Sequence, residues 1–320
     1  MDTRLLELAH KPIAGLSVST YTPPSAQQGI LSNTLVLFIN GLSATQSSWY
    51  PVAEKLIRQR EGDGSSMPLL LSYDRYGQGD SDSDPADGPD KPHGHSISDV
   101  ITDLHHLLEH ACKNIFYKKL ADMRLILVCH AMGCALARLY TAAHPGCVEA
   151  LLFLDSAIAN SDFVSLFPDP DSERAGLSRL PPGVTPEDLR HARAVSQKYF
   201  HPTSPTKENM DHRDLPILLP DADKPALPNG PSGKRPLLVV VGHDWNVFAN
   251  ESRDGFLEIS EPVTNAYLNS RWALYNASLT EIAESGEVKI AEGCGHFIQK
   301  DSPEFVVSEI NGLISSVMKR

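Results

Sequence analysis

The sequence lacks any apolar run that approaches the roughly 20 residues needed to span a membrane as a helix. Basic residues are also scarce, with 28 Lys and Arg against 40 Asp and Glu and a formal net charge of −12. Proteins that bind nucleic acid need clustered cations to neutralise the phosphate backbone, and an anionic membrane would repel an acidic surface. We therefore expect a partner that is neither nucleic acid nor membrane.

Cysteine is scarce as well. The chain has five cysteines, an odd number, and no CxxC pair or Cys–His cluster with zinc-ligand spacing. The N-terminus lacks the apolar core of a signal peptide. These absences predict reduced thiols, a cytoplasmic protein and no metal site, and they leave the oligomeric state open.

Short apolar runs alternate with helical patterns along most of the chain. This alternation is typical of parallel strands joined by crossover helices, and runs that are apolar throughout predict a sheet covered on both faces. The expected strands are Leu35–Ile39, Leu69–Tyr73, Leu125–Val128, Ala150–Leu154, Leu237–Val241 and Val288–Ile290. The polar-alternating stretch Leu16–Tyr21 predicts an antiparallel edge strand. The fold class is therefore α/β, with a mostly parallel central sheet flanked by helices.

One region interrupts this alternation. Thirteen of the 24 prolines lie between Pro168 and Pro236, and a helix is expected inside the region at Pro186–Tyr199, after a Thr185 cap. A long insertion in a compact domain is usually a binding element. We assign residues 1–159 and 236–320 to a core domain and residues 160–235 to an inserted helical lid.

The segment Cys129-His130-Ala131-Met132-Gly133 lies between an expected buried strand and an expected helix of small residues, Met132–Ala143. A strand, a sharp turn and a helix are the context of the G-x-S-x-G motif, in which a serine nucleophile sits in the turn. Three other segments strengthen this interpretation. They are Phe38-Ile-Asn-Gly-Leu42, Tyr73-Asp-Arg-Tyr-Gly-Gln-Gly-Asp-Ser81 and Gly293-Cys-Gly-His296-Phe-Ile-Gln299.

Together these segments resemble the α/β-hydrolase superfamily, and the stretch Trp272–Ile310 looks like a subgroup of small-molecule esterases and lactonases. The resemblance implies an α/β-hydrolase fold, a Ser–acid–His triad and no cofactor. Ala131 stands where the serine is expected, and the resemblance assigns the role of general base to His296. It also implies that the backbone N–H groups of Leu42 and Met132 form the oxyanion hole.

Two carboxylates compete for the acid of the triad. Asp155 ends the strand that follows the expected helix Met132–Ala143, 24 residues beyond position 131, and Asp244 ends the next strand. We favour Asp155, because the aspartate at the later site comes one residue earlier than the usual pattern.

The expected substrate is an ester or lactone of an apolar small molecule, bound near Gly41, His130, Phe163 and Phe167. A methyl group cannot be deprotonated, so Ala131 has three explanations. The chain is an inactivated variant of a hydrolase, a natural pseudoenzyme that binds a small molecule, or a lyase or cyclase that needs only His296 and the oxyanion hole.

A second group of histidines lies upstream, at positions His93, His95, His105, His106 and His110. Their spacing distributes them over a helix and the residues before it. We expect them to be solvated or to cap the helix, and not to bind a metal.

Overall fold

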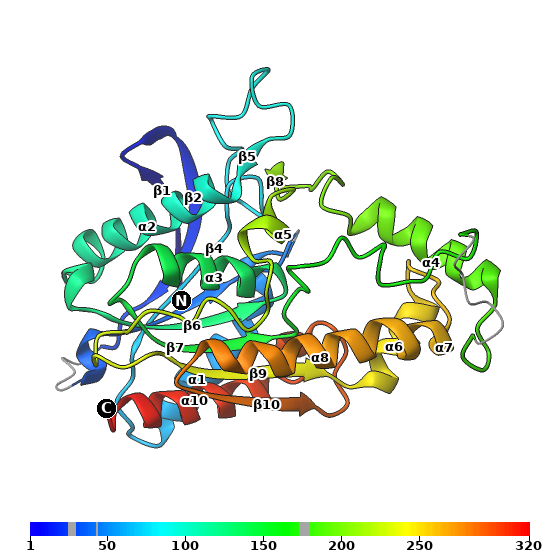
Figure 1. The fold of residues 1–320 in the computed structure, drawn as a ribbon. Coiled ribbons are helices and arrows are strands. Elements are labelled where there is room, and N and C mark those ends of the chain that lie inside the picture. Colours follow the sequence, from blue (N-terminus) through cyan, green and yellow to red (C-terminus); the bar gives the residue numbers. More distant parts are fainter. Residues whose placement is uncertain (25–29, 43, 173–179) are drawn as a thin grey trace.

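The computed structural model describes residues 1–24, 30–42, 44–172 and 180–320. Eight of its strands form one sheet in the order β1-β2-β4-β3-β6-β7-β9-β10 (Figure 1). These strands are β1 (Asp2–Leu8), β2 (Lys11–Tyr21), β3 (Thr34–Ile39), β4 (Leu69–Tyr73), β6 (Arg124–His130), β7 (Val148–Leu154), β9 (Leu237–His243) and β10 (Ser285–Ala291). The strands from β4 to β10 in this order pair in parallel, whereas β1 and β2 run antiparallel to their neighbours.

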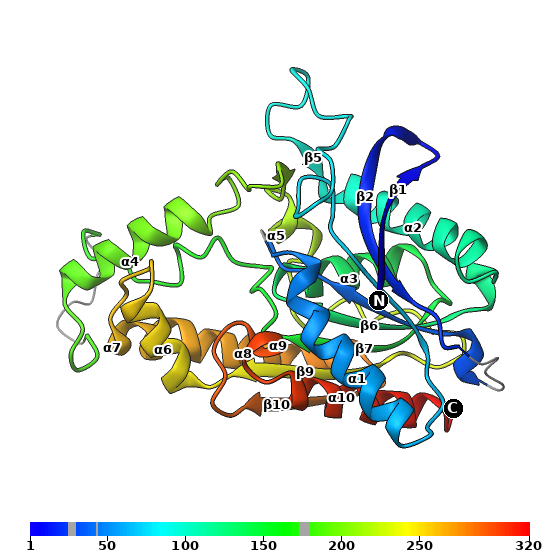
Figure 2. The same ribbon diagram turned by 180° about the vertical axis from the view of Figure 1, so that it is seen from behind.

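Helices cover both faces of the sheet. In Figure 1, α2 (Ile97–Asn114), α3 (Met132–Ala143) and α8 (Ser270–Leu279) lie in front of it, and Figure 2 shows α1 (Tyr50–Gly62) and α10 (Pro303–Val317) on the other side. Successive residues of β3 belong alternately to two hydrophobic clusters, so a layer of helices is needed on each face of the sheet. Leu35, Leu37 and Ile39 enter one hydrophobic cluster, and the intervening residues of the strand enter the other. Both faces of the strand are buried, which excludes water from the whole centre of the sheet.

All six apolar runs predicted as parallel strands lie in strands of this sheet. The prediction that Leu16–Tyr21 forms an edge strand is wrong in one respect. This stretch is part of β2 and is antiparallel, but β1 pairs with its other side and occupies the edge. The edge strand lacks a continuous apolar face, since only Leu6 and Leu8 are buried in it, so its sequence carries little strand signal.

The connection from β7 to β9 is the longest in the chain and contains α4 (Pro186–Tyr199), β8 (Met210–Asp211) and α5 (Leu215–Leu218). The predicted Thr185 cap is present, because the Thr185 hydroxyl accepts from the Asp188 amide and the Asp188 carboxylate accepts in return. Strand β8 pairs with β5 (His95–Ser96), outside the main sheet. Residues 173–179 of the connection fall outside the described residues, and the assignment of 160–235 to a lid stays a prediction.

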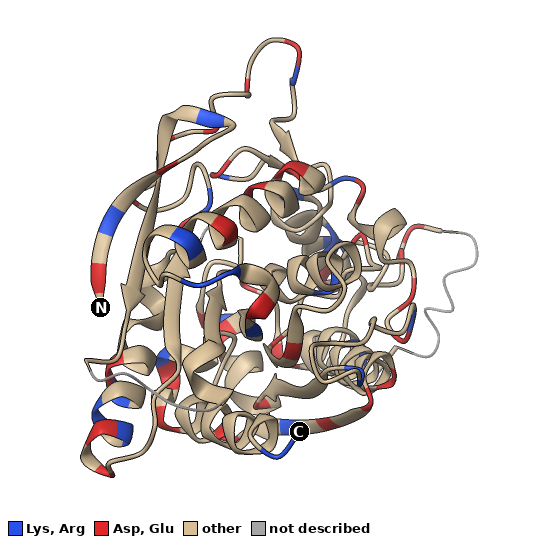
Figure 3. Cartoon of the chain, turned by 90° about the vertical axis from the view of Figure 1, so that its left-hand side faces the viewer, with Lys and Arg blue, Asp and Glu red and all other residues tan. Residues whose placement is uncertain are grey.

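Besides short 3-10 helices, four further elements follow β9 in the chain. They are α6 (Trp245–Asp254), α7 (Glu261–Val263), a π-helical turn (Thr264–Asn269) and α9 (Ile298–Asp301). Among the described residues, no helix combines the length and apolar character needed to cross a bilayer. Acidic and basic residues are interspersed along the chain in the view of Figure 3.

Candidate active site

The turn between β6 and α3 has an unusual backbone. Ala131 lies between the last residue of the strand and the first of the helix, with φ 48° and ψ −117°. A residue with a side chain avoids positive φ, and such a conformation costs on the order of 1–3 kcal/mol. Gly133 allows the helix to start this close to the sheet, since a Cβ there would lie 2.4 Å from the backbone oxygen of Ile39. The turn therefore presents position 131 at the N-terminus of α3.

His296 lies in the loop after β10 and contacts a carboxylate at the end of β7. Its Nδ1 is 2.6 Å from Oδ2 of Asp155. The Asp155 side chain is fully buried, whereas 27 % of the His296 side chain is exposed. Burial by itself would raise the pKa of Asp155, but His243 and His296 together hold it well below its ordinary value. Asp155 is therefore ionised, and Nδ1 of His296 donates to it.

The second candidate carboxylate has different partners. Asp244 accepts hydrogen bonds from the amides of Asn246 at 2.9 Å and Gly293 at 3.1 Å. It caps α6 and fixes the loop that leads to His296. Of the two carboxylates proposed from the sequence, the structure brings Asp155 into contact with His296.

Sequence reasoning missed His243, the last residue of β9. Its Nδ1 lies 2.7 Å from Oδ1 of Asp155, so the carboxylate has one histidine on each oxygen. Polar residues at the carboxyl ends of parallel strands meet at one edge of a sheet, and this signal was available because His243 directly precedes Asp244.

The loop after β3 is held by a buried guanidinium. Arg75 donates to the carbonyl oxygens of Asn40 at 2.8 Å and Gly41 at 2.9 Å, and it pairs with Glu208 at 2.8 Å. The carbonyl of Gly41 and the N–H of Leu42 belong to one planar trans peptide and point in opposite directions. Arg75 therefore turns the Leu42 N–H away from itself. At α3, the N–H of Met132 is among those that have no partner inside the helix.

Gly41 lies directly against the turn at Ala131. A Cβ at Gly41 would be 2.9 Å from Nδ1 of His130 and 3.1 Å from Cβ of Ala131. His130 is buried, and its pKa is lowered to about 3, mainly by burial and further by the neighbouring His296. The imidazole of His130 is therefore neutral near pH 7.

The two phenylalanines expected near the substrate differ in exposure. Phe163 is half-buried, has φ 60° and lies 5.7 Å from the ring of Phe200. Phe167 is fully buried and lies 6.2 Å from the ring of Tyr267. Of the two, Phe163 is partly accessible, and Phe167 belongs to the main hydrophobic cluster.

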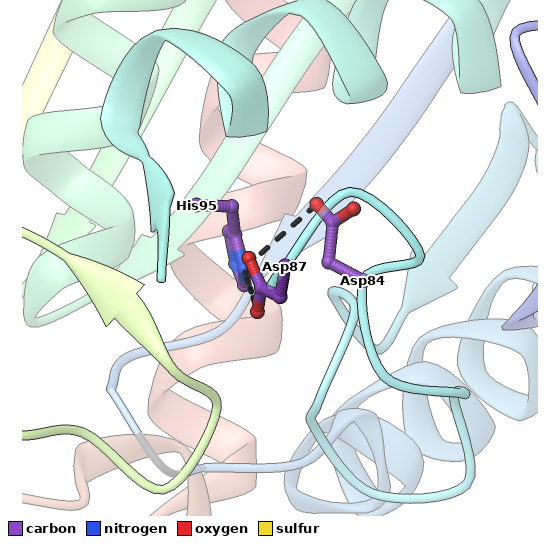
Figure 4. A group of neighbouring side chains, drawn as sticks. All are labelled: Asp84, Asp87 and His95. Atoms are coloured by element: carbon purple, nitrogen blue, oxygen red, sulfur yellow. Dashed lines mark hydrogen bonds and ion pairs between the residues drawn. The ribbon is translucent and has the colours of Figure 1, made fainter. Parts of the chain in front are cut away.

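A separate group of side chains resembles a cation site. Asp84, Asp87 and His95 each offer a ligand atom, and these atoms lie within 4.8 Å of one another (Figure 4). His95 is buried and Ser96 caps α2, so the prediction of a solvated or capping residue is wrong for this member of the upstream group. Oδ2 of Asp84 also accepts from the buried Lys11 ammonium at 2.6 Å. This ammonium already supplies a positive charge where a divalent cation would bind.

Comparisons with known proteins agree with this fold. A family model described as the alpha/beta hydrolase family matches residues 36–309. The search of curated proteins finds no match. Among solved structures, a carboxylesterase study of the thaumarchaeon Nitrososphaera gargenis matches with a TM-score of 0.52 at 14% identity, covering 99% of both chains.

Two further solved structures show the same fold. Alpha/beta hydrolase domain-containing protein 10 from mouse matches with a TM-score of 0.56 at 11% identity, covering 99% of this chain and 100% of that one. An epoxide hydrolase mutant of Vigna radiata matches with a TM-score of 0.54 at 15% identity, covering 98% of both chains.

Proposed function

The chain belongs to the alpha/beta hydrolase family, and on this premise we propose that its site is built to hydrolyse a carboxylic ester or lactone of an apolar small molecule. The observation that carries the proposal is the contact of 2.6 Å between His296 and Asp155, at the same end of the sheet as the strained turn at Ala131. As the sequence stands, the nucleophile is missing. The chain is therefore an inactive or strongly impaired form of such a hydrolase.

With a serine at position 131, the reaction has two halves. Nε2 of His296 takes the hydroxyl proton while the serine oxygen forms a bond to the carbonyl carbon of the substrate. The tetrahedral intermediate collapses, the bond to the alkoxy oxygen breaks, and His296 returns the proton to the leaving alcohol. Water then attacks the acyl-enzyme by the same route and releases the acid. Asp155 keeps Nδ1 of His296 protonated, so that Nε2 is the basic nitrogen throughout.

The oxyanion is held by the N–H groups of Leu42 and Met132. The hydrogen bonds from Arg75 and Gln78 to the Gly41 carbonyl support the first of these donors, because they fix the peptide that carries the Leu42 N–H. The position of Met132 at the start of α3 supports the second. Fixed donors of this kind act where negative charge develops, in a site that excludes water.

Aromatic side chains near His296 support an apolar substrate. The ring of Phe297 lies 5.1 Å from that of His296, and 38% of Phe297 is exposed. The rings of Trp272 and Phe248 lie 6.0 Å and 6.5 Å from that of His296, and both are buried. Phe163 belongs to the segment 160–235, which leaves the sheet just after Asp155. In this proposal the segment covers the bound substrate.

A second candidate function is the binding of a small molecule without its conversion. Ala131 favours it directly, because a methyl group cannot attack a carbonyl carbon. A third, a lyase or cyclase reaction, would use His296 as the base and the same two N–H donors.

The deciding experiment is the Ala131→Ser variant, measured on short-chain aryl esters and on lactones. The serine of a well-studied protease is worth about 10⁶ in kcat, so we expect hydrolysis far above that of the unchanged chain. The matched control is the double variant Ala131→Ser/His296→Ala, which keeps the hydroxyl and removes the base.

The possible outcomes are distinct. A folded Ala131→Ser variant that cleaves none of these substrates would contradict the hydrolase and favour the binding protein. Turnover by the unchanged chain that is lost in His296→Ala would favour the lyase or cyclase.

A further inference from the structure

Asp155 has a second histidine partner that the hydrolytic mechanism does not use. Oδ2 of Asp155 contacts His296, and Oδ1 lies 2.7 Å from Nδ1 of His243. Only 2% of the His243 side chain is exposed. A buried polar ring at the centre of a site needs partners for both of its nitrogens.

The hydrogen bonds of His243 determine how many protons it carries. Nδ1 faces an ionised carboxylate and must donate to it. Nε2 lies 2.8 Å from Oδ1 of Asn269. The orientation of this amide is fixed, because its Nδ2 donates to the backbone oxygen of Trp245 at 3.1 Å, and a carbonyl can only accept. Nε2 of His243 therefore donates as well, and a ring that donates from both nitrogens is an imidazolium.

The uncharged neighbours of His243 favour this cation. The ring of Phe248 stacks on it with centroids 4.2 Å apart, and the ring of Trp272 lies 5.2 Å away. Both distances lie within the roughly 6 Å over which aromatic rings stabilise a cation.

The charged groups around His243 come from three elements. Asp155 follows β7, Asp244 and Glu251 belong to the start and body of α6, and His296 follows β10. Burial lowers the pKa of His243, but Asp155 first, then Asn269 and Glu251, raise it above its ordinary value. Among the described neighbours of His243 there are thus three carboxylates and one other group that can be a cation, His296.

We propose that His243 is a protonated positioning residue that shares Asp155 with His296 and so weakens the hold of His296 on a proton. Its charge is independent of the hydrolase proposal, whereas its role in catalysis rests on that proposal. One carboxylate already balances one imidazolium, so protonation of His296 places a second positive charge beside a single negative one. The charge of His243 therefore opposes a second positive charge on His296, which favours the return of the proton from His296 to the leaving alcohol.

The first test uses the unchanged chain and needs no activity. In ¹⁵N-labelled protein at pH 7.5, NMR spectra should show a proton on both ring nitrogens of His243. The His243→Gln variant assigns these signals by their loss. A His243 ring with only one protonated nitrogen at this pH would overturn the proposal.

The second test is the pH profile of kcat/KM in the Ala131→Ser background. Adding His243→Gln keeps an N–H donor near Asp155 but removes the charge, so we expect the acid limb to move up by on the order of one pH unit. Adding His212→Gln changes another buried histidine, outside the site, and should leave the limb in place. A lower rate at every pH with an unmoved limb would mean that His243 is only structural.

The two tests separate the two proposals. An inert Ala131→Ser variant would refute the hydrolase, and with it the catalytic role of His243. The NMR spectra of the unchanged chain would still decide whether His243 carries its charge.

Discussion

Nε2 of His130 donates to the carbonyl oxygen of His296 across 2.9 Å. The residue before Ala131 therefore holds the loop that carries His296, and the two rings lie 4.6 Å apart. Because the proton of His130 is on Nε2, its Nδ1 is a bare acceptor, and among the described residues it has no hydrogen-bond partner. It faces Gly41, where no side chain fits. Protonation of Nδ1 would place a buried charge at the joint of two loops.

This geometry predicts that His130 makes stability depend on pH. Burial lowers the folded pKa of His130 to about 3, from an ordinary value of 6.5. Below pH 6.5 His130 is protonated in the unfolded chain but stays neutral in the folded chain. The contribution of His130 to the free energy of unfolding is therefore fully present above pH 6.5. It is lost progressively as pH falls from 6.5 to about 3. Between pH 7 and pH 5 the loss from this residue is about 2 kcal/mol. Urea unfolding at both values measures it.

The matched variant for this measurement is His130→Gln, which keeps an N–H donor for the His296 carbonyl but does not titrate. Other histidines contribute equally to both proteins and cancel in the difference. If the variant loses as much free energy of unfolding as the unchanged chain, His130 is not the group responsible.

The two candidate carboxylates should differ sharply in kinetic effect. In the Ala131→Ser background, Asp155→Asn should lower kcat by about 10⁴, the effect of the corresponding change in a well-studied protease, because the histidine then adopts the wrong tautomer. Asp244→Asn should lower kcat far less, since asparagine still caps α6 and only the acceptor for the Gly293 N–H is lost. Steady-state rates of the two variants decide between them. Equal losses of kcat in the two variants would mean that Asp155 is not the acid that orients His296.

Gly133 and Gly312 form a matched pair for stability. A Cβ at Gly133 would lie 2.4 Å from the backbone oxygen of Ile39, whereas a Cβ at Gly312 in α10 would meet no atom within 4 Å. We expect Gly133→Ala to lower the free energy of unfolding by about 1–3 kcal/mol, and Gly312→Ala to raise it by about 0.5–1 kcal/mol. Thermal or urea unfolding gives both values. A neutral Gly133→Ala would show that α3 can move away from β3 at little cost.

The central sheet could be predicted because its strands are buried on both faces and are therefore apolar without interruption. The same physical reason explains the error at the N-terminus. Strand β1 exposes most of its residues, including Leu5 at 63%, and it is held to β2 by backbone pairing that leaves no hydrophobic pattern. Periodicity reports burial, so an edge strand of this kind carries little signal.

Parts of the candidate site could be predicted where a short sequence motif marks a backbone shape. The turn at Ala131 and the loop of His296 are both short sequences with a required backbone shape. The place of His243 at the end of an expected strand could have been noted, but its role depends on a contact with Asp155, 88 positions away. The same holds for Arg75 and Glu208, which lie 133 residues apart in the sequence. Their ion pair holds the loop of Gly41 in place. Such contacts are products of the tertiary fold, and one sequence without relatives does not reveal them.

The buried pair of Arg75 and Glu208 has a mechanical consequence. Glu208 lies in the connection between β7 and β9, and Arg75 holds the carbonyls of Asn40 and Gly41. One guanidinium thus links the long segment above the sheet to the peptide that presents the Leu42 N–H. A displacement of the segment near Glu208 would pull on Arg75 and rotate that peptide. The geometry of that peptide therefore depends on where the chain places Glu208, a residue 133 positions further along the sequence.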